Sequence, residues 1–343
     1  MGVYKFKICE KEDLPRLLTF IDTYWKKNHI LVRSKEILDF QYYNCGTGKY
    51  DFVLAENMQT GELDGIRGWI RVDQYDPALA QYDEVWSAVS KVRTDVENNE
   101  IKVLGSYLWR YLEKHKGFGT VGISRFSFAM HTAIRHKTCS LGQFFILNRE
   151  TKDFKVAVIP ADYQYLIETK ESDWHLREIA DINIIPDDVV KAYYRPFKSK
   201  TYLINRFAKH PVYHYHFYGI FNGNALTTIL VGKFVESNGG RILRIVDVLG
   251  SLEEVDCLYD NFQSILHESE CEYVDFLCFG IDDSVFRKMG FDKLDPKQDK
   301  LIIPNYFEPF EAKNIVINGA YKPAERYCMF KADADQDRPS LTN

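Results

Sequence analysis

Apolar and polar residues alternate along two stretches of the first third of the chain, with the period of two that is typical of half-buried β-strands. Strands are predicted at residues 3–9, 51–57, 66–72 and 84–93, and the alternation runs through the first and the last of these. Between the first two, apolar residues recur at helical spacing over residues 12–25 and about 35–44. The turn-like sequence QTGELDG separates 51–57 from 66–72 and predicts a β-hairpin.

Residues 84–112 carry the most informative pattern. A strand over 84–93 precedes a helix in which Leu104, Leu108 and Leu112 share one face, and Gly105 marks the expected turn into that helix. A strand that leads into a helix N-terminus presents unpaired N–H groups and the positive end of the helix dipole. We therefore predict an anion-binding loop at residues 102–106, suited to a diphosphate.

The rest of the chain continues in the same manner. Residues 119–126, 127–136 and 142–148 predict a strand, a helix and a closing strand. The second half roughly repeats the element order, with expected elements at 215–224, 226–235, 241–250, 255–269, 271–280, 283–291 and 300–310. Residues 184–197 are predicted to be helical as far as Arg195. We expect an N-terminal domain at 1–150, a connector at 151–190 and a second domain at 191–343 that ends in a polar tail.

The composition is that of a folded protein without a strong charge. Of 343 residues, 45% are hydrophobic and 15% aromatic, the formal net charge is -5 and the pI is about 6.0. This balance argues against nucleic acid as the main ligand, and no apolar run approaches the roughly 20 residues that span a bilayer. The seven cysteines show no metal-ligand spacing and the N-terminus shows no signal-peptide pattern, so we expect reduced thiols in a cytoplasmic protein.

The element order, with a phosphate-type loop after the fourth strand, resembles the GNAT superfamily of acyl-CoA-dependent N-acyltransferases. The usual loop has Gln or Arg, two residues, Gly, one residue, and Gly or Ala. In the aligned residues 100–105 only Gly105 matches. The resemblance implies an α/β (α+β) fold of two tandem GNAT-like domains, each a mixed central sheet flanked by helices, with the first domain binding acyl-CoA.

Three further stretches carry a closer resemblance. Residues 24–44, 198–215 and 330–339 are similar to tandem-GNAT proteins encoded in bacterial surface-polysaccharide clusters. Those proteins are similar to enzymes that acylate the amine of a nucleotide-linked amino sugar, for example a dTDP-3-amino-3,6-dideoxyhexose, with acetyl or 3-hydroxybutanoyl groups. The resemblance implies direct attack of the sugar amine on the thioester, as a step of O-antigen or capsule biosynthesis.

Acyl-CoA needs donors for its pyrophosphate and a strand edge for its pantetheine arm. The residues expected to supply them are Lys91, Val92 and Arg93 on the strand and Lys102, Val103, Leu104, Gly105 and Ser106 at the loop. Lys91 and Arg93 are interpreted equally well as solvated charges on a strand face.

Two histidines are candidates for proton transfer. His131 aligns with the position at which the GNAT pattern often places a tyrosine acid, and His29 lies between the first two helices, in the region that faces the acceptor. Histidine titrates near neutrality and suits either direction of transfer. A packing histidine is the alternative interpretation for His131, and a helix-terminus histidine over a hydrophobic staple is the alternative for His29.

The acceptor is expected to contact residues from several parts of the chain. Trp25 would form an aromatic wall and Gln41 would offer a hydrogen-bonding amide, while Lys200 and Arg206 would match a nucleotide diphosphate. An exposed amphipathic helix is the alternative for the last two. Asp335 and Arg338 belong to a tail that we expect to fold back and bind sugar hydroxyls, and its carboxylates lack the Gly and distal Glu of an EF-hand, so no metal is expected.

Two other functions stay open at this point. One is acyl or aminoacyl transfer to a different amine, and the other is a non-catalytic binding protein that keeps the fold. Binding of CoA would separate the enzyme from the binding protein. The expected partners are therefore the two small-molecule substrates, with no nucleic acid and no membrane, and a monomer or small homo-oligomer.

Overall fold

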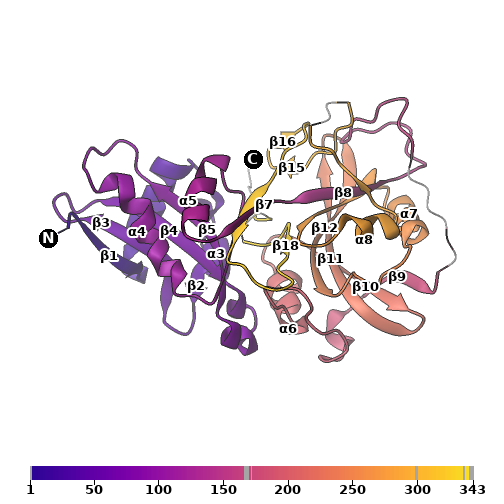
Figure 1. The fold of residues 1–343 in the computed structure, drawn as a ribbon, viewed down its shortest axis with the longest axis horizontal. Coiled ribbons are helices and arrows are strands. Elements are labelled where there is room, and N and C mark those ends of the chain that lie inside the picture. The colour runs from indigo at the N-terminus through magenta and orange to yellow at the C-terminus, as the bar shows by residue number, and fades with distance from the viewer. Residues whose placement is uncertain (1, 166–169, 171, 298–299, 335–336, 340–343) are drawn as a thin grey trace.

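Two mixed β-sheets lie side by side in the computed structural model, which describes residues 2–165, 170, 172–297, 300–334 and 337–339 (Figure 1). The first sheet has the order β1 (Tyr4–Cys9), β3 (Lys49–Asn57), β4 (Leu63–Arg71), β5 (Glu84–Val92), β6 (Gly117–Val121), β17 (Asn318–Tyr321) and β7 (Lys137–Ser140), and β2 (Tyr43–Asn44) pairs with β3. Within it β5 and β6 are parallel and the other neighbours are antiparallel.

The second sheet has the same mixed character. Its order is β14 (Asp292–Lys293), β8 (Gly142–Leu147), β13 (Tyr273–Phe279), β12 (Gly240–Gly250), β11 (Ala225–Ser237), β10 (His216–Asn222) and β9 (Trp174–Glu178), and β18 (Met329–Phe330) pairs with β13. Here β12 and β13 are the parallel pair. A separate two-stranded sheet is formed by β15 (Tyr306–Phe307) and β16 (Phe310–Glu311).

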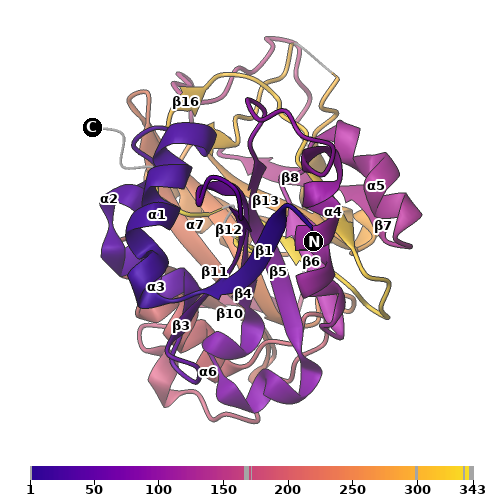
Figure 2. The same ribbon diagram turned by 90° about the vertical axis from the view of Figure 1, so that its left-hand side faces the viewer.

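Helices cover both faces of the first sheet (Figure 2). On one face lie α1 (Leu14–Phe20), α2 (Ile30–Arg33) and α3 (Lys35–Tyr42), and on the other lie α4 (Ile101–Glu113) and α5 (Phe128–Ala133). Residues of β3 alternate between the two layers, because Phe52 and Leu54 pack with the first set while Val53 and Ala55 pack with α4. The helix α4 comes close to β4 at Gly65, where an added Cβ would lie 3.0 Å from Leu108.

The second sheet carries α6 (Lys200–Leu203), α7 (Tyr259–Glu268) and α8 (Asp283–Lys288). One hydrophobic cluster runs through both halves, since it joins Leu31 and Trp86 of the first half to Phe207 and Val231 of the second. The two sheets are thus packed on a shared core.

The chain passes between the sheets three times, the last time from β17 to β18 of the second sheet. It leaves β7 of the first sheet at Ser140 and enters β8 of the second at Gly142, and residues 318–321 return to the first sheet as β17. The strand predicted to close the first domain therefore belongs to the second sheet, and β9 falls inside the predicted connector. The domain boundaries themselves stay a prediction.

Most of the predicted elements are present, and three are corrected. Gly105 is the fifth residue of α4 instead of the turn before it, so residues 102–106 are helix and not loop. Residues 184–197 form turns and not a helix, because prolines at 186 and 196 interrupt the backbone hydrogen bonds that a helix needs. Prolines 304 and 309 likewise limit the strand predicted over 300–310 to the two residues of β15.

Candidate functional site

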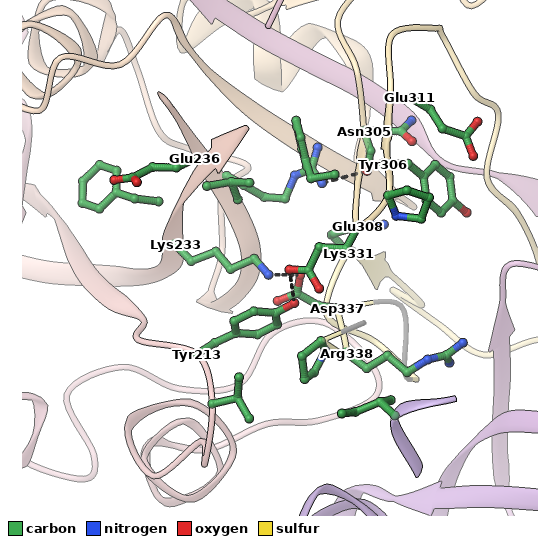
Figure 3. A pocket seen from close by; sticks show the side chains of 18 of the residues that line it. Tyr213, Lys233, Glu236, Asn305, Tyr306, Glu308, Glu311, Lys331, Asp337 and Arg338 are labelled. Atoms are coloured by element: carbon green, nitrogen blue, oxygen red, sulfur yellow. Dashed lines mark hydrogen bonds and ion pairs between the residues drawn. The ribbon is translucent and has the colours of Figure 1, made fainter. Parts of the chain in front are cut away.

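A cleft with a volume of about 1070 Å³ opens between the two halves of the molecule (Figure 3). Its walls come from residues 26–30 before and within α2, the segment 212–216, strands β11 and β12, the loop 305–311, and Lys331 and residues 337–339 of the C-terminal segment. This volume is at the upper end of the range of small-molecule sites, roughly 300–1,000 Å³, so a ligand as large as a nucleotide sugar fits it.

Positive charge dominates the walls of the cleft. The acidic side chains that line it are Glu236, Glu308, Glu311 and Asp337. The basic ones are twice as numerous, namely Lys26, Lys27, Arg33, Lys233, Arg241, Arg244, Lys331 and Arg338. A concave surface with this excess attracts anionic ligands.

The C-terminal segment forms one wall because it is built into the second sheet. The parallel pairing of β12 with β13 ends at Ile245 and Phe276, and beyond that point the two strands separate. The segment fills the gap: β18 pairs with β13, and the N–H of Ala332 donates to the carbonyl of Val246 at 2.9 Å.

A buried ion-pair triad anchors this segment. The Lys198 ammonium contacts Asp247 at 2.5 Å and Asp333 at 2.8 Å, and all three side chains are buried. Burial raises the pKa of Asp247 to about 6, against the effect of the Lys198 charge. Asp333, a member of the triad, also accepts from the N–H of Phe330. The triad therefore holds the backbone on both sides of Lys331.

The corresponding gap in the first sheet is not filled in this way. The parallel pairing of β5 with β6 ends at Ser87 and Thr120, while β5 continues to Val92. Gly122, immediately after β6, lines the cleft. The separating strands therefore present an extended backbone edge that leads toward the cleft.

Three of the predicted site residues meet at one end of the cleft. His29, which is 3% exposed, lines the cleft, its ring lies 4.5 Å from that of Trp25, and the Arg338 guanidinium lies 5.3 Å from the Trp25 ring. The N–H of Leu31 donates to His29 Nδ1 at 3.3 Å, which leaves the proton on Nε2.

The protonation of His29 follows from this setting. Burial, together with the charges of Arg338 and Lys26, lowers its pKa to about 3. The ring is therefore neutral at physiological pH, and its buried Nε2 has no hydrogen-bond partner among the described residues. It suits donation of a hydrogen bond to a ligand oxygen better than acceptance of a proton.

Three other predicted acceptor residues, Gln41, Lys200 and Arg206, lie outside the lining of the cleft. Gln41 is a buried residue of α3. Lys200 donates to the carbonyl of Ile185 and pairs with Asp187 at 2.7 Å. The buried Arg206 donates to the Tyr75 hydroxyl at 3.0 Å and to the carbonyls of residues 332 and 334 at 3.2 Å, so its hydrogen bonds hold the C-terminal segment. Asp335 lies outside the described residues.

The residues predicted to bind the pyrophosphate of CoA lie in acidic surroundings. Arg93 is paired with Glu62 at 2.6 Å, Asp95 at 2.9 Å and Asp64 at 3.4 Å. The Glu100 carboxylate stands at the start of α4 and accepts from the N–H of Val3 at 3.0 Å. These acids oppose a phosphate at this helix N-terminus.

The remaining members of that predicted group divide by exposure. Leu104 is a fully buried residue of α4, while Val103 is exposed. The others are at least partly exposed on β5 and α4, namely Lys91, Lys102, Gly105 and Ser106. A Cβ added to Gly105 would meet the Val92 side chain at 3.9 Å. Contact of these residues with CoA stays a prediction.

His131 lies in the hydrophobic layer between α4 and α5 and does not line the cleft. Its ring packs edge-on against Trp109 at 5.0 Å, and burial, followed by the nearby His136 and Arg67, lowers its pKa to about 4.

Arg67 is a further residue that the sequence did not point to. It is buried without a carboxylate partner among the residues that the structure describes, it donates to the Ser87 hydroxyl at 3.1 Å and it lies over the Trp109 ring at 4.3 Å.

Sequence reasoning missed the principal charges of the cleft, Lys233, Arg244 and Lys331. Each interrupts an otherwise apolar stretch: Lys233 in LTTILVGKFV, Arg244 in RILRIVDVLG and Lys331 after CMF. A charged residue within a buried strand is rare unless it is paired or functional. A charge that interrupts an apolar stretch was therefore the sequence signal that could have identified these residues.

Neither a membrane-spanning helix nor a metal-binding group is found among the described residues. Within the part of the chain that the structure describes, no helix is long and apolar enough to cross a membrane. In the same residues, no group of three or more His, Cys, Asp or Glu side chains is arranged to hold a metal ion.

Comparisons with known proteins bear on the fold. No family model matches the sequence, and no curated protein matches it. The structure is similar to that of a GCN5-related N-acetyltransferase from Anabaena variabilis, with a TM-score of 0.50, 10% identity, and coverage of 93% of this chain and 72% of that one. It is also similar to a conserved protein of unknown function from Enterococcus faecalis, described as a probable N-acyltransferase, with a TM-score of 0.50, 8% identity, and coverage of 92% and 72%. At this identity the likeness concerns the fold alone, and it confirms the predicted class: two mixed sheets flanked by helices in a GNAT-like two-domain arrangement.

Proposed function

We propose that this protein transfers an acyl group, of the acetyl or 3-hydroxybutanoyl type, from acyl-CoA to the amine of a nucleotide-linked amino sugar for O-antigen or capsule biosynthesis. One observation carries the proposal: the edge left where β5 and β6 separate leads into a large basic cleft between the two halves. The fold supplies the place for an acyl donor, and the cleft supplies the place for an anionic acceptor.

The donor is assigned to the first sheet. Pantetheine carries two amides, which pair with an extended strand edge in the manner of an added strand. Residues 88–92 of β5 run beyond the parallel pairing and offer such an edge. The equivalent gap of the second sheet holds the C-terminal segment, so the second half is assigned to the acceptor.

The acceptor is assigned from the size and charge of the cleft. A nucleotide sugar carries two phosphate charges, and the eight basic side chains of the lining outnumber its four acidic ones. The free cysteines also suit a reducing compartment, the cytoplasm, where we place the reaction.

The chemistry needs no covalent enzyme intermediate. The neutral amine attacks the thioester carbonyl, the C–N bond forms, the C–S bond breaks, and the amine proton leaves while the CoA thiolate takes one up. The His29 Nε2–H at the cleft wall is suited to hold a substrate oxygen in place, and water in the open cleft is suited to carry the proton.

Calorimetric titration with CoA tests the donor assignment. We expect submillimolar binding by the wild-type protein, weaker binding by Gly105→Glu, which adds an acid beside Val92, and unchanged binding by the control Gly105→Ala. A folded protein that shows no binding at millimolar CoA would overturn the proposal.

A non-catalytic binding protein is the second candidate function. The acids around the start of α4, Glu100 among them, favour it because they oppose the pyrophosphate of CoA. A nucleotide sugar that binds in the cleft, together with the absence of any CoA binding, would support this candidate instead.

A further inference from the structure

Lys331 is an unusual group in the wall of the cleft. Its side chain is 3% exposed, it lines the cleft, and its Nζ lies 5.1 Å from the centre of the Tyr306 ring (Figure 3). Within the described part of the chain, no carboxylate forms an ion pair with this ammonium and no oxygen accepts a hydrogen bond from it. Burying a charge without a partner is costly, so the position calls for an explanation.

The neighbouring charges do not neutralise Lys331. Lys233 pairs with Asp337 at 2.7 Å, and Asp337 also accepts from the Tyr215 hydroxyl. Arg244 binds Asp275 through two hydrogen bonds of 2.9 and 2.6 Å.

Both nearby carboxylates are therefore engaged by other cations, and one positive charge is left over. Burial, followed by the charge of Arg244, lowers the pKa of Lys331 to about 7, which is the response of an ammonium that lacks a counter-ion.

The backbone is held on both sides of Lys331, since Phe330 before it pairs with β13. Ala332 is hydrogen-bonded to Val246, and Asp333 is bound to Lys198. Lys331 is thus preorganised, and little conformational entropy is lost when it contacts a ligand. A mobile surface lysine would lack this property.

We propose that Lys331, with Lys233 beside it, forms a seat for the diphosphate of a nucleoside diphosphate group. An anion supplies the partner that Lys331 lacks, and two adjacent phosphates match two adjacent cations. The identity of the nucleotide as the acceptor rests on the proposed function, whereas the binding of a diphosphate does not.

The first test is binding of inorganic pyrophosphate, measured by calorimetry near pH 7. We expect Lys331→Met to weaken binding by about tenfold or more, the loss of one charge-assisted hydrogen bond. Lys331→Arg, which keeps the charge, should retain most of the affinity, and Lys5→Met, an exposed lysine of β1, should behave as wild type. Equal affinity of Lys331→Met and the wild type would overturn the seat, as would a folded wild type that binds no pyrophosphate at 10 mM.

Proton uptake provides a second readout that does not depend on affinity. The groups that face Lys331 are Arg244, Lys233, Asp275, Asp337 and Tyr306, and burial lowers the pKa of Lys331 to about 7. Pyrophosphate binding at pH 7.5 should take up a proton in the wild type, and this uptake should be absent in Lys331→Met. Uptake that persists in the variant would exclude Lys331.

Two nucleotides separate the possible sources of the diphosphate. We expect dTDP to show the Lys331 dependence and CoA not to show it. The reverse result would assign the seat to the donor and overturn the acceptor assignment. Acyl transfer is measured separately. Pyrophosphate binding that depends on Lys331, found together with no acyl transfer, would overturn the proposed function but support the diphosphate seat.

Discussion

At the scale of single residues, the structure separates groups that hold the fold from groups that lack a partner. Arg206 and Lys198 are buried cations whose partners are all within the chain. In the cleft wall, the buried Nε2 of His29 has no hydrogen-bond partner among the described residues, and the buried Lys331 has no carboxylate partner among them. Burial of an unpaired polar group reduces stability unless a ligand supplies the missing partner. Binding of a ligand therefore explains why Lys331 and His29 are buried at this place.

Lys331 should make stability depend on pH. The unfolded chain keeps the Lys331 proton up to about pH 10, whereas the folded chain releases it near 7, so the free energy of unfolding rises with pH between these values. Denaturant unfolding at pH 7 and 9 should show a rise that is smaller in Lys331→Met by roughly 2–3 kcal/mol. An identical pH dependence in both proteins would contradict the pKa of about 7.

At the scale of elements, alternation and helical spacing predicted most strands and helices, because both sheets bury one or two faces of each strand. Gly105 was interpreted as a turn marker, but α4 packs on the sheet through Leu104 and Leu108 and continues past the glycine. Tertiary packing of that face outweighs the low helix propensity of one glycine.

The helical position of Gly105 predicts the effect of alanine. Gly105→Ala should stabilise the protein by about 0.5–1 kcal/mol, because the added Cβ meets nothing closer than 3.9 Å. Gly119→Ala is the matched contrast and should destabilise by about 1–3 kcal/mol, since its Cβ would lie 2.1 Å from the Tyr327 hydroxyl. Denaturant midpoints measure both, and a destabilised Gly105→Ala would contradict the helix assignment.

The C-terminal segment is the element whose role the sequence did not reveal, since its pairing with β13 and β12 joins residues far apart in the chain. Asp333→Ala removes one partner of buried Lys198 and one acceptor of the Phe330 N–H. We expect a loss of about 2 kcal/mol or more in the free energy of unfolding. Asp295→Ala, an exposed aspartate in a turn, serves as the control, and equal effects of the two changes would refute the anchoring role.

At the scale of the whole molecule, two sheets exchange strands and share a core, and this arrangement could not be derived from patterning. The strand β17 inserts between β6 and β7, and Arg195 bonds to Glu84 across the halves at 2.9 Å. The predicted repeat of element order was sufficient for the fold class, but strand exchange depends on contacts between residues about 180 positions apart. Lys233, Arg244 and Lys331, which line the cleft, were missed for the same reason.

This interlocking predicts a single cooperative unit. The isolated fragment 1–150 lacks β17 and should fail to fold, whereas the full chain should unfold in one transition. Circular dichroism and limited proteolysis of the fragment provide the check, with the full chain as control. A protease-resistant fragment with native-like spectra would show that residues 1–150 form an independent domain.

The central claim is acyl transfer between a donor at β5 and an acceptor in the basic cleft. The most direct measurement incubates the purified chain with acetyl-CoA or 3-hydroxybutanoyl-CoA and a panel of amino-sugar nucleotides, and follows CoA thiol release and product mass together. We expect thiol release that requires the acceptor, with one N-acylated nucleotide sugar formed for each thiol. A folded protein that releases no thiol with any pair of the panel would contradict it.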